Sequence, residues 1–580
     1  MSKLTIGSGL GITTSLGSST KSTWTKPSDW PELPTITASD NKFAGLYAVW
    51  PNQDNFIALT ASCNNGASGY TVDWGDGSIE TFGAGVAAYH NYDYNDADIT
   101  VTCSRGYKIV TVQVYPTTSG HTFYTFSLAT KHNQTGLASY YTTGWLDIAF
   151  AGTAIGSTNL TIGNTNPIQH RNLERARFYA LNNWLGGSLF TGCTNLRSVT
   201  MPANTAFFTT TANMFNSCYA ITDIPLFDTA NVTTMQSMFD GCYSLQSVPL
   251  FNTNKVTNMS YMFRNCYSLQ IVPKFNTANV TTMQNMFAVC RTLKSVPEFN
   301  TANVTMMASM FSDASGLQTV PKFNTSKVTN MSNMFANDDG LISVPAFDTA
   351  NVTDMSGMFY DCYGLTAAPP MNTSKVTSMA SMFSMFYGTN AIIETVPTYD
   401  TANVIYINEM FRNCSGLKTV PNFNTSKANT MYGMFYGCHT LQSIPTLDTA
   451  NNKVFDYFFY NCYALQSAPV LNTANGQSFI NMFSGCTSLP IVPAINVSNT
   501  TVTGNYTSMF TNMYSCANIA ASQFKYSFSV AGLRLSNTAL NYIFTNLPTV
   551  SAQTVTITSN YGANSCNTTI ATSKGWTVTN

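Results

Sequence analysis

Hydrophobic residues return to the same positions of a 24-residue unit over residues 189–515. The segment FNTNKVTNMSYMFRNCYSLQIVPK (251–274) is followed at once by FNTANVTTMQNMFAVCRTLKSVPE (275–298). Both keep Phe, Asn-Thr, Val-Thr, Met, Met-Phe, Cys, Leu and Val-Pro, while the residues between vary. A fixed period in the twenties predicts a solenoid with one short strand and one return segment per coil. We expect the repeated apolar residues to stack inward on their own copies.

Two independent sets of residues give the same phase for this repeat. The prolines of the Val-Pro step recur in step with the Met-Phe pair, whose first residue is Met214, Met238, Met262, Met286, Met310, Met334, Met358, Met382, Met410, Met434, Phe458, Met482 and Met509. Residues are added before Met410 and before Met509. Such insertions form loops on one side of a solenoid, either as tolerated bulges or as binding loops.

Each part of a coil carries its own structural signal. Leu245, Val248 and Phe251, with variable and often polar residues between them, predict the strand. Asn252-Thr253 predicts a turn, because short polar side chains bond back to nearby backbone N–H groups. The spacing of apolar residues over 256–263 predicts one buried face of a helix or 3₁₀ segment.

The repeat resembles the leucine-rich repeats of BspA-like bacterial surface proteins, notably their coils of the FDTSNVTNMSGMF type. FDTANVTDMSGMF at 347–359 carries the resemblance. It implies a β-rich or α+β fold, a right-handed leucine-rich-repeat solenoid, which we place at residues 189–515. It implies little about function, because this repeat serves as a scaffold in adhesins, surface antigens and phage proteins alike.

A different pattern precedes the repeats. Alternating apolar runs flank the segment YTVDWGDGSIETF (70–82) and predict a small antiparallel sandwich with a hairpin at Asp76-Gly77. WGDGS (74–78), followed by His90 and Tyr92, resembles a PKD domain of the immunoglobulin-like class. We therefore expect an extended attachment arm at 1–40, a PKD-like sandwich at 41–117, a transition and N-terminal cap at 118–188, and a C-terminal cap at 516–580.

Composition narrows the classes of function. Only 9% of the 580 residues are charged and the net charge is -1, which disfavours nucleic acid as a partner. No apolar run is long enough to cross a membrane. The N-terminus lacks the continuous apolar run of a secretory signal, which favours folding in the cytoplasm or a trimmed chain.

Searches for catalytic and metal-binding patterns predict no catalytic residues, no metal site and no cofactor. The five histidines, His90, His121, His132, His170 and His439, do not have metal-ligand spacing, and neither a nucleophile elbow nor a phosphate loop is present. Asp73 and Asp76 are open to two interpretations, a turn or a calcium site, and the turn is favoured.

Most of the fourteen cysteines follow the repeat. Neighbouring coils would bring their copies close enough for disulfides, whereas inward cysteines among Met, Phe and Leu would be inert thiols. Ala314 and Asp338 interrupt the series, so no pairing scheme is enforced. Thiols are the favoured interpretation.

Variable outward positions are the candidates for ligand binding. A tyrosine follows the cysteine in several coils, and exposed rings could stack on sugars or simply cover the coil edges. The position after Val-Pro varies in charge. The predicted binding residues are Tyr219, Tyr243, Tyr267, Tyr363, Tyr463, Lys274, Glu298 and Lys322.

These features favour a non-enzymatic structural protein of a bacteriophage virion, such as a fibre, tail accessory or capsid-surface protein. Its arm would contact other virion proteins, its solenoid would contact host-surface glycans or proteins, and the chain would form a homo-oligomer. The alternative is a BspA-like adhesin on the bacterial cell surface. An enzyme acting on polysaccharide is a third hypothesis.

Overall fold

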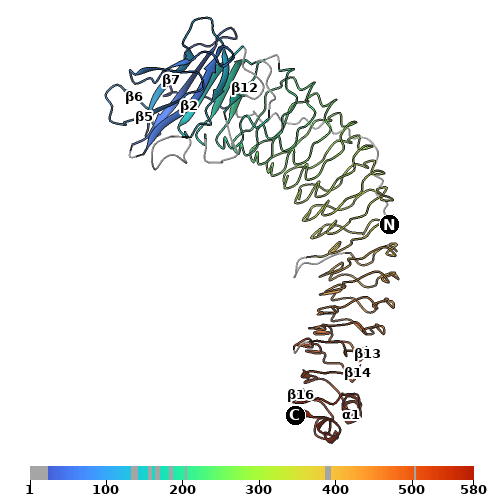
Figure 1. The fold of residues 1–580 in the computed structure, drawn as a ribbon. Coiled ribbons are helices and arrows are strands. Elements are labelled where there is room, and N and C mark those ends of the chain that lie inside the picture. The colour runs from blue at the N-terminus through green and yellow to red at the C-terminus, as the bar shows by residue number, and fades with distance from the viewer. Residues whose placement is uncertain are drawn as a thin grey trace, which may run out of the picture.

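A β-sandwich leads directly into a long curved solenoid, which a small C-terminal element closes (Figure 1). The computed structural model describes residues 24–51, 53–131, 142–153, 160–162, 170–181, 187–202, 205–385, 393–501 and 504–580. The predicted solenoid fold is confirmed. The first 23 residues of the predicted arm, His132 and most of the first insertion lie outside the described residues. No helix in the described ranges is long and apolar enough to cross a membrane.

Two sheets form the sandwich. The larger has the order β12-β11-β9-β1-β7-β3-β4, with β6 paired to β7, and the smaller has the order β10-β8-β2-β5. Phe43 and Phe126 join the sheets through rings 4.9 Å apart. The predicted hairpin is confirmed, since β3 and β4 pair in antiparallel register across Asp76-Gly77. The bounds are β1 Lys42–Val49, β2 Asn55–Cys63, β3 Tyr70–Asp73, β4 Ile79–Phe82, β5 Ala87–Tyr92, β6 Val101–Thr102, β7 Lys108–Pro116, β8 Phe123–Ser127, β9 Trp145–Ala151, β10 Leu160–Thr161, β11 Arg175–Ala180 and β12 Ser198–Thr200, with a 3₁₀ turn at Asn64–Gly66.

The larger sheet changes direction where the solenoid begins. Strand β9 pairs with β1 in antiparallel fashion, but β11 pairs with β9, and β12 with β11, in parallel. Both sheets therefore take strands from beyond residue 117. The core is continuous across this junction, because the rings of Phe150, Phe178, Phe190 and Phe215 follow one another at 6.4, 5.7 and 5.3 Å.

The predicted helical segment of each coil is wrong, because the chain there forms a series of tight turns. The amide of Met262 donates to the carbonyl of Met259 (3.3 Å), whereas the amide of Tyr261 donates to Gln284 of the next coil (2.9 Å). Tyr261 and Asn265 have φ values of 60° and 62°. A left-handed residue every four positions is incompatible with a helix and turns alternate amides toward the neighbouring coil.

The predicted strand is present only as an extended segment in the middle coils. Between β12 and residue 490, the coils are linked by isolated parallel bridges such as Asn258 to Thr282. The amides of Ile271, Val272 and Lys274 form no hydrogen bond among the described residues. Proline at position 273 has no amide hydrogen to contribute, so a ladder cannot extend through this part of the coil.

Polar residues of the Asn-Thr step hold the coils together. The Asn or Asp side chain accepts a hydrogen bond from the amide two residues later, as in Asn252 to Asn254 (3.1 Å), which confirms the predicted turn. The threonine is buried, and its hydroxyl donates to a backbone carbonyl of the next coil at 2.7–3.0 Å. This Thr ladder consists of Thr205, Thr229, Thr253, Thr277, Thr301, Thr325, Thr349, Thr373, Thr401, Thr425, Thr449 and Thr473.

The last coils and the C-terminal element contain regular secondary structure. The predicted helix is confirmed as α1 (Asn537–Thr545), whose amide at Ala539 donates to the N-cap hydroxyl of Ser536 (3.2 Å). The predicted strand is confirmed as β16. The remaining elements are β13 Ile491–Asn496, paired in parallel with β14 Asn518–Ser522, and β15 Phe528–Ser529, β16 Gln553–Thr556, α2 Thr569–Thr572 and β17 Trp576–Thr579.

Candidate functional site

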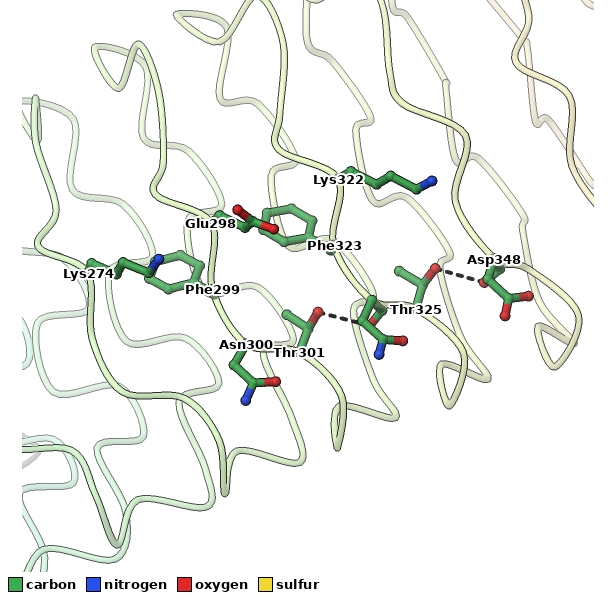
Figure 2. Close-up of a pocket in the computed structure, with 10 residues that line it drawn as sticks. Lys274, Glu298, Phe299, Asn300, Thr301, Lys322, Phe323, Thr325 and Asp348 are labelled. Carbon is green, nitrogen blue, oxygen red and sulfur yellow. Dashed lines mark hydrogen bonds between the residues drawn. The ribbon is translucent and has the colours of Figure 1, made fainter.

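A groove on the solenoid brings three of the predicted binding residues together. Lys274, Glu298 and Lys322 occupy the same position of successive coils and line a groove of about 640 Å³ (Figure 2). Each follows the proline that ends the extended segment, so each side chain emerges at the same edge of its coil. All three are exposed.

Two buried rings form the floor of the groove, and hydrogen bonds between coils lie behind them. Phe299 and Phe323 form the floor and are almost completely buried. Behind them, Thr301 donates to the carbonyl of Asn324 (2.8 Å), and Thr325 donates to that of Asp348 (2.7 Å), as the dashed lines in Figure 2 show. Coil-to-coil bonds of buried threonines therefore link successive coils along the groove.

The second wall is a row of amide and carboxylate side chains. Asn300, Asn324 and Asp348 each use one side-chain oxygen to accept the amide two residues later, at 3.1–3.2 Å. Their other polar atoms lie at the groove surface. Sequence reasoning assigned this Asn-Thr step to turns alone, and no signal in the sequence shows that it also faces the charged row.

Lys274, Glu298 and Lys322 form no ion pair with any described residue. Other charges of the solenoid do pair between coils, as Arg264 does with Asp240 (2.5 Å) and Arg291 with Asp313 (2.6 Å). The groove thus carries a row of two positive charges and one negative charge that are free to bind a ligand.

The predicted tyrosines lie on a different column of the solenoid from the groove. Tyr219, Tyr243 and Tyr267 stack with centroids 4.4 and 4.7 Å apart, and the guanidinium of Arg291 lies over the last ring at 5.5 Å. Tyr463 stacks on His439 at 4.7 Å. Tyr243 is covered on both faces by its neighbours, so its edge and hydroxyl are what a ligand would meet.

Tyr363 occupies the same column and is partly buried against the core. Its neighbour in the preceding coil of this column is Asp339, which has no ring. The structure therefore brings the lysines and the glutamate together at one groove and leaves the tyrosines outside it.

The Asp76 cluster is a turn that supports the sandwich. Asp76 accepts hydrogen bonds from Ser78 (2.7 Å) and contacts the Nε2 atom of His90 at 2.6 Å. Partial burial acts to raise the pKa of Asp76, but the hydrogen bonds from Ser78 and His90 outweigh it and lower the pKa below its usual value. The carboxylate sits between hydroxyl and imidazole, whereas a nucleophilic triad needs the imidazole next to the hydroxyl.

No group of three or more His, Cys, Asp or Glu side chains within the described ranges could hold a metal ion. His170 is buried, which lowers its pKa to about 3, and His121 contacts the hydroxyl of Ser68 at 3.0 Å. These histidines are separate from one another.

All fourteen cysteines are free thiols, and thirteen are buried. Nine cysteines of the coils donate Sγ–H to the carbonyl of a phenylalanine in the preceding coil, as Cys266 does to Phe239 at 3.2 Å. Asp338 takes the cysteine position in one coil, and both of its carboxyl oxygens are buried without a hydrogen bond of normal geometry. Burial raises the pKa of Asp338 well above its usual value.

Comparison with known proteins matches the repeats. The sequence profile of a family described as "Mycoplasma protein of unknown function, DUF285" matches residues 187–296, 269–368 and 369–472, which together make up just under half of the chain. No curated protein sequence matches the chain. Repeat and fold define the protein as a leucine-rich-repeat type solenoid.

Solved structures with similarity to the chain include several leucine-rich-repeat proteins. One from Eubacterium ventriosum is 18% identical, with a TM-score of 0.33, and the match covers 66% of this chain and 91% of that one. One from Leptospira interrogans is 10% identical, with a TM-score of 0.18 and coverage of 70% and 90%. Toll from Drosophila, in its complex with Spatzle, is 14% identical, with a TM-score of 0.20 and coverage of 70% and 56%.

Proposed function

We propose that this protein is a non-enzymatic recognition protein displayed on a bacterial surface, and that its solenoid presents the groove of Lys274, Glu298 and Lys322 to a ligand. The single observation that carries the proposal is the row of three unpaired charges over the groove. Charged side chains fixed at one edge of stacked coils favour a partner that is bound by electrostatic complementarity.

The bacterial setting is supported by the family profile, which is named for Mycoplasma. Display on a bacteriophage particle, with attachment through the N-terminal arm and assembly as a homo-oligomer, is the other setting that suits a binding scaffold. One localisation experiment separates the two. Antibodies against the solenoid should label intact cells of the producing bacterium, whereas recovery of the chain with purified phage particles would replace surface display by virion assembly.

The binding part of the proposal has its own test. Substituting all three charged residues by alanine should abolish attachment of the purified protein to its target cells, with the fold unchanged by circular dichroism. Exchanging the exposed pair Glu394 and Lys418, which lie 2.8 Å apart elsewhere on the solenoid, is the matched control. Attachment that survives the triple substitution would place the binding surface elsewhere.

A further inference from the structure

We infer that the groove binds an extended segment of another protein, with aliphatic side chains at one end and alternating acidic and basic side chains at the other. This inference rests on the proposed function of the groove and specifies its ligand. It follows from an apolar extension of the charged row, from the burial of the two aromatic rings at the groove floor, and from unpaired backbone groups beside the groove.

The charged row continues into exposed aliphatic residues. Leu226 and Leu250 occupy, in the two preceding coils, the position of Lys274, and they are 68% and 62% exposed. Ile271, three residues before Lys274, is 62% exposed. Large aliphatic side chains that stay in water in adjacent coils mark an interaction surface, because burying them against a partner is favourable.

The chemistry of this row disfavours the other classes of ligand. Sugars bind by stacking on open aromatic faces, but Phe299 and Phe323 are only 3% and 2% exposed, and the exposed aliphatics offer no flat ring. A polyanion would meet Glu298 between the two lysines and be repelled there. A polypeptide can supply apolar contacts and charges of both signs within a few residues.

Backbone groups beside the row fit a polypeptide as well. In the coil that ends at Glu298, the amides of Ser295, Val296 and Glu298 form no hydrogen bond among the described residues. The same holds for Ile271 and Lys274 one coil earlier. Amides left unpaired by the coils are donors for the carbonyls of a bound polypeptide. Because the row crosses the extended segments, the polypeptide would meet these amides one coil at a time and would not pair with one coil as an added strand.

The length of the row determines how many residues of the bound polypeptide are needed to span it. From Leu226 to Lys322 the row crosses four coil intervals, which at about 4.8 Å each is roughly 19 Å. An extended polypeptide advances about 3.3 Å per residue, so about six residues span the row. Acidic side chains opposite Lys274 and Lys322, and a basic one opposite Glu298, would satisfy the three charges.

A peptide selection tests this assignment. The full-length protein is immobilised and challenged with a displayed library of random linear peptides of about twelve residues, long enough to span the row. We expect enrichment of peptides that carry aliphatic residues next to alternating acidic and basic residues. The K274E/E298K/K322E variant should enrich peptides of the opposite charge order, and the L226N/L250N variant should bind the wild-type peptides about tenfold or more weakly, as expected for loss of anchor residues.

The E394K/K418E exchange is the matched control and should select the same peptides as the wild type. The inference is overturned if wild type and charge-reversed protein select the same motif, if no peptide binds at the row, or if neutral polysaccharides bind there instead. If the protein is absent from the cell surface but still selects a charge-dependent peptide motif, only the proposed surface display is contradicted. If the protein is found on the cell surface but selects no such motif, only the peptide inference is contradicted.

Discussion

The core of the sandwich is built from contacts that occur once, whereas the core of the solenoid is built from contacts that repeat from coil to coil. In the sandwich, contacts occur once: Trp74 stacks on His90 at 4.7 Å, and the hydroxyl of Tyr92 donates to the carbonyl of Trp74 at 2.8 Å. In the solenoid, one contact is copied from coil to coil, as in the ring distances of 5.6 Å between Phe263 and Phe287 and 5.8 Å between Phe287 and Phe311.

This difference determines what a substitution can teach. A substitution in the sandwich removes a contact that occurs nowhere else in the protein, so its effect on stability cannot be compared with that of an equivalent position. A change in the solenoid has other coils as internal controls, because the same residue sits in the same surroundings several times. Stability of stacked repeats is close to a sum over coils and their interfaces, so damage should remain local.

The largest effect is expected from Phe287→Ala. Removing a buried ring from the stack should cost about 3–5 kcal/mol of unfolding free energy. Hydrogen exchange should show lost protection in the coils around residue 287 and unchanged protection in β1 and β7. Tyr267→Ala, on the outer face, is the control with a small effect. Uniform loss of protection in both regions would contradict the local behaviour of the solenoid.

Asp338→Cys should stabilise the protein at neutral pH. The substitution restores the residue of neighbouring coils and removes a buried carboxyl without hydrogen bonds, a gain of about 1–3 kcal/mol. Because the folded pKa of Asp338 is raised, the contribution of Asp338 to wild-type stability is most favourable below the unfolded pKa of about 4 and becomes less favourable as pH rises above it.

The gain from Asp338→Cys should therefore be large at pH 7 and small near pH 3, below the unfolded pKa of about 4, where the aspartate is mostly protonated in both states. Urea denaturation at the two pH values measures it. Asp348→Asn, at the groove surface, is the control. A gain of equal size at both pH values would show that volume, and not ionisation, governs the position.

Asp76→Ala tests a contact that occurs once in the sandwich. Loss of the hydrogen bonds with Ser78 and His90 should cost about 1–3 kcal/mol at pH 7. The pKa of Asp76 is lowered, so its contribution is present above the unfolded pKa of about 4 and is lost as pH falls through the folded value. Thermal unfolding followed by tryptophan fluorescence should show a deficit at pH 7 that shrinks at pH 3. The control is Asp73→Ala, which removes an exposed hydrogen bond from the amide of Gly75 (3.0 Å) and a longer one from Gln113 (3.3 Å).

Thr301→Val and Thr305→Val compare a buried and an exposed threonine of one coil. Thr301 donates to the carbonyl of Asn324 at 2.8 Å inside the Thr ladder, whereas the exposed Thr305 donates to that of Thr281 at 3.2 Å. Loss of the buried bond should cost about 1 kcal/mol or more, and loss of the exposed one should cost less, because water replaces it. The denaturant midpoints of the two variants measure this difference. Equal midpoints would show that the buried Thr ladder contributes no more to stability than the exposed threonine does.

The smallest effect is expected from Val289→Asn. Val289 has a φ of 64°, a conformation that β-branched residues avoid and that Asn tolerates. The substitution should raise stability by about 0.5–1 kcal/mol, in the range of other relieved backbone strain. Asn337→Val, at the equivalent position with a φ of 63°, should lose a similar amount, and melting temperatures of both variants report it. A loss in Val289→Asn would mean that the valine side chain contributes packing that outweighs the strain.

The inward half of the fold follows from the sequence. In a stacked array each side chain meets its own copy, so sequence period and spatial contact are the same information. Phe251, Val256, Met259, Met262 and Cys266 recur in most coils and are all buried. The Asn-Thr turn follows as well, because its hydrogen bonds lie within a few residues. The buried repeat positions and the Asn-Thr turn can therefore be predicted from the sequence alone.

The conformation of the turn segment and the arrangement of the surface residues depend on which residues of the neighbouring coils lie beside them. Apolar spacing over 256–263 suits both a helix and a ribbon of turns, and bonds to the next coil favour the ribbon. Outward residues have no period to follow, so only the tertiary structure shows that Lys274, Glu298 and Lys322 share a groove while Tyr219, Tyr243 and Tyr267 stack on one another. The sequence by itself determined the coil and its interior, because those contacts are copies of one another. The tertiary structure decided the surface, because coil stacking determines which variable side chains meet.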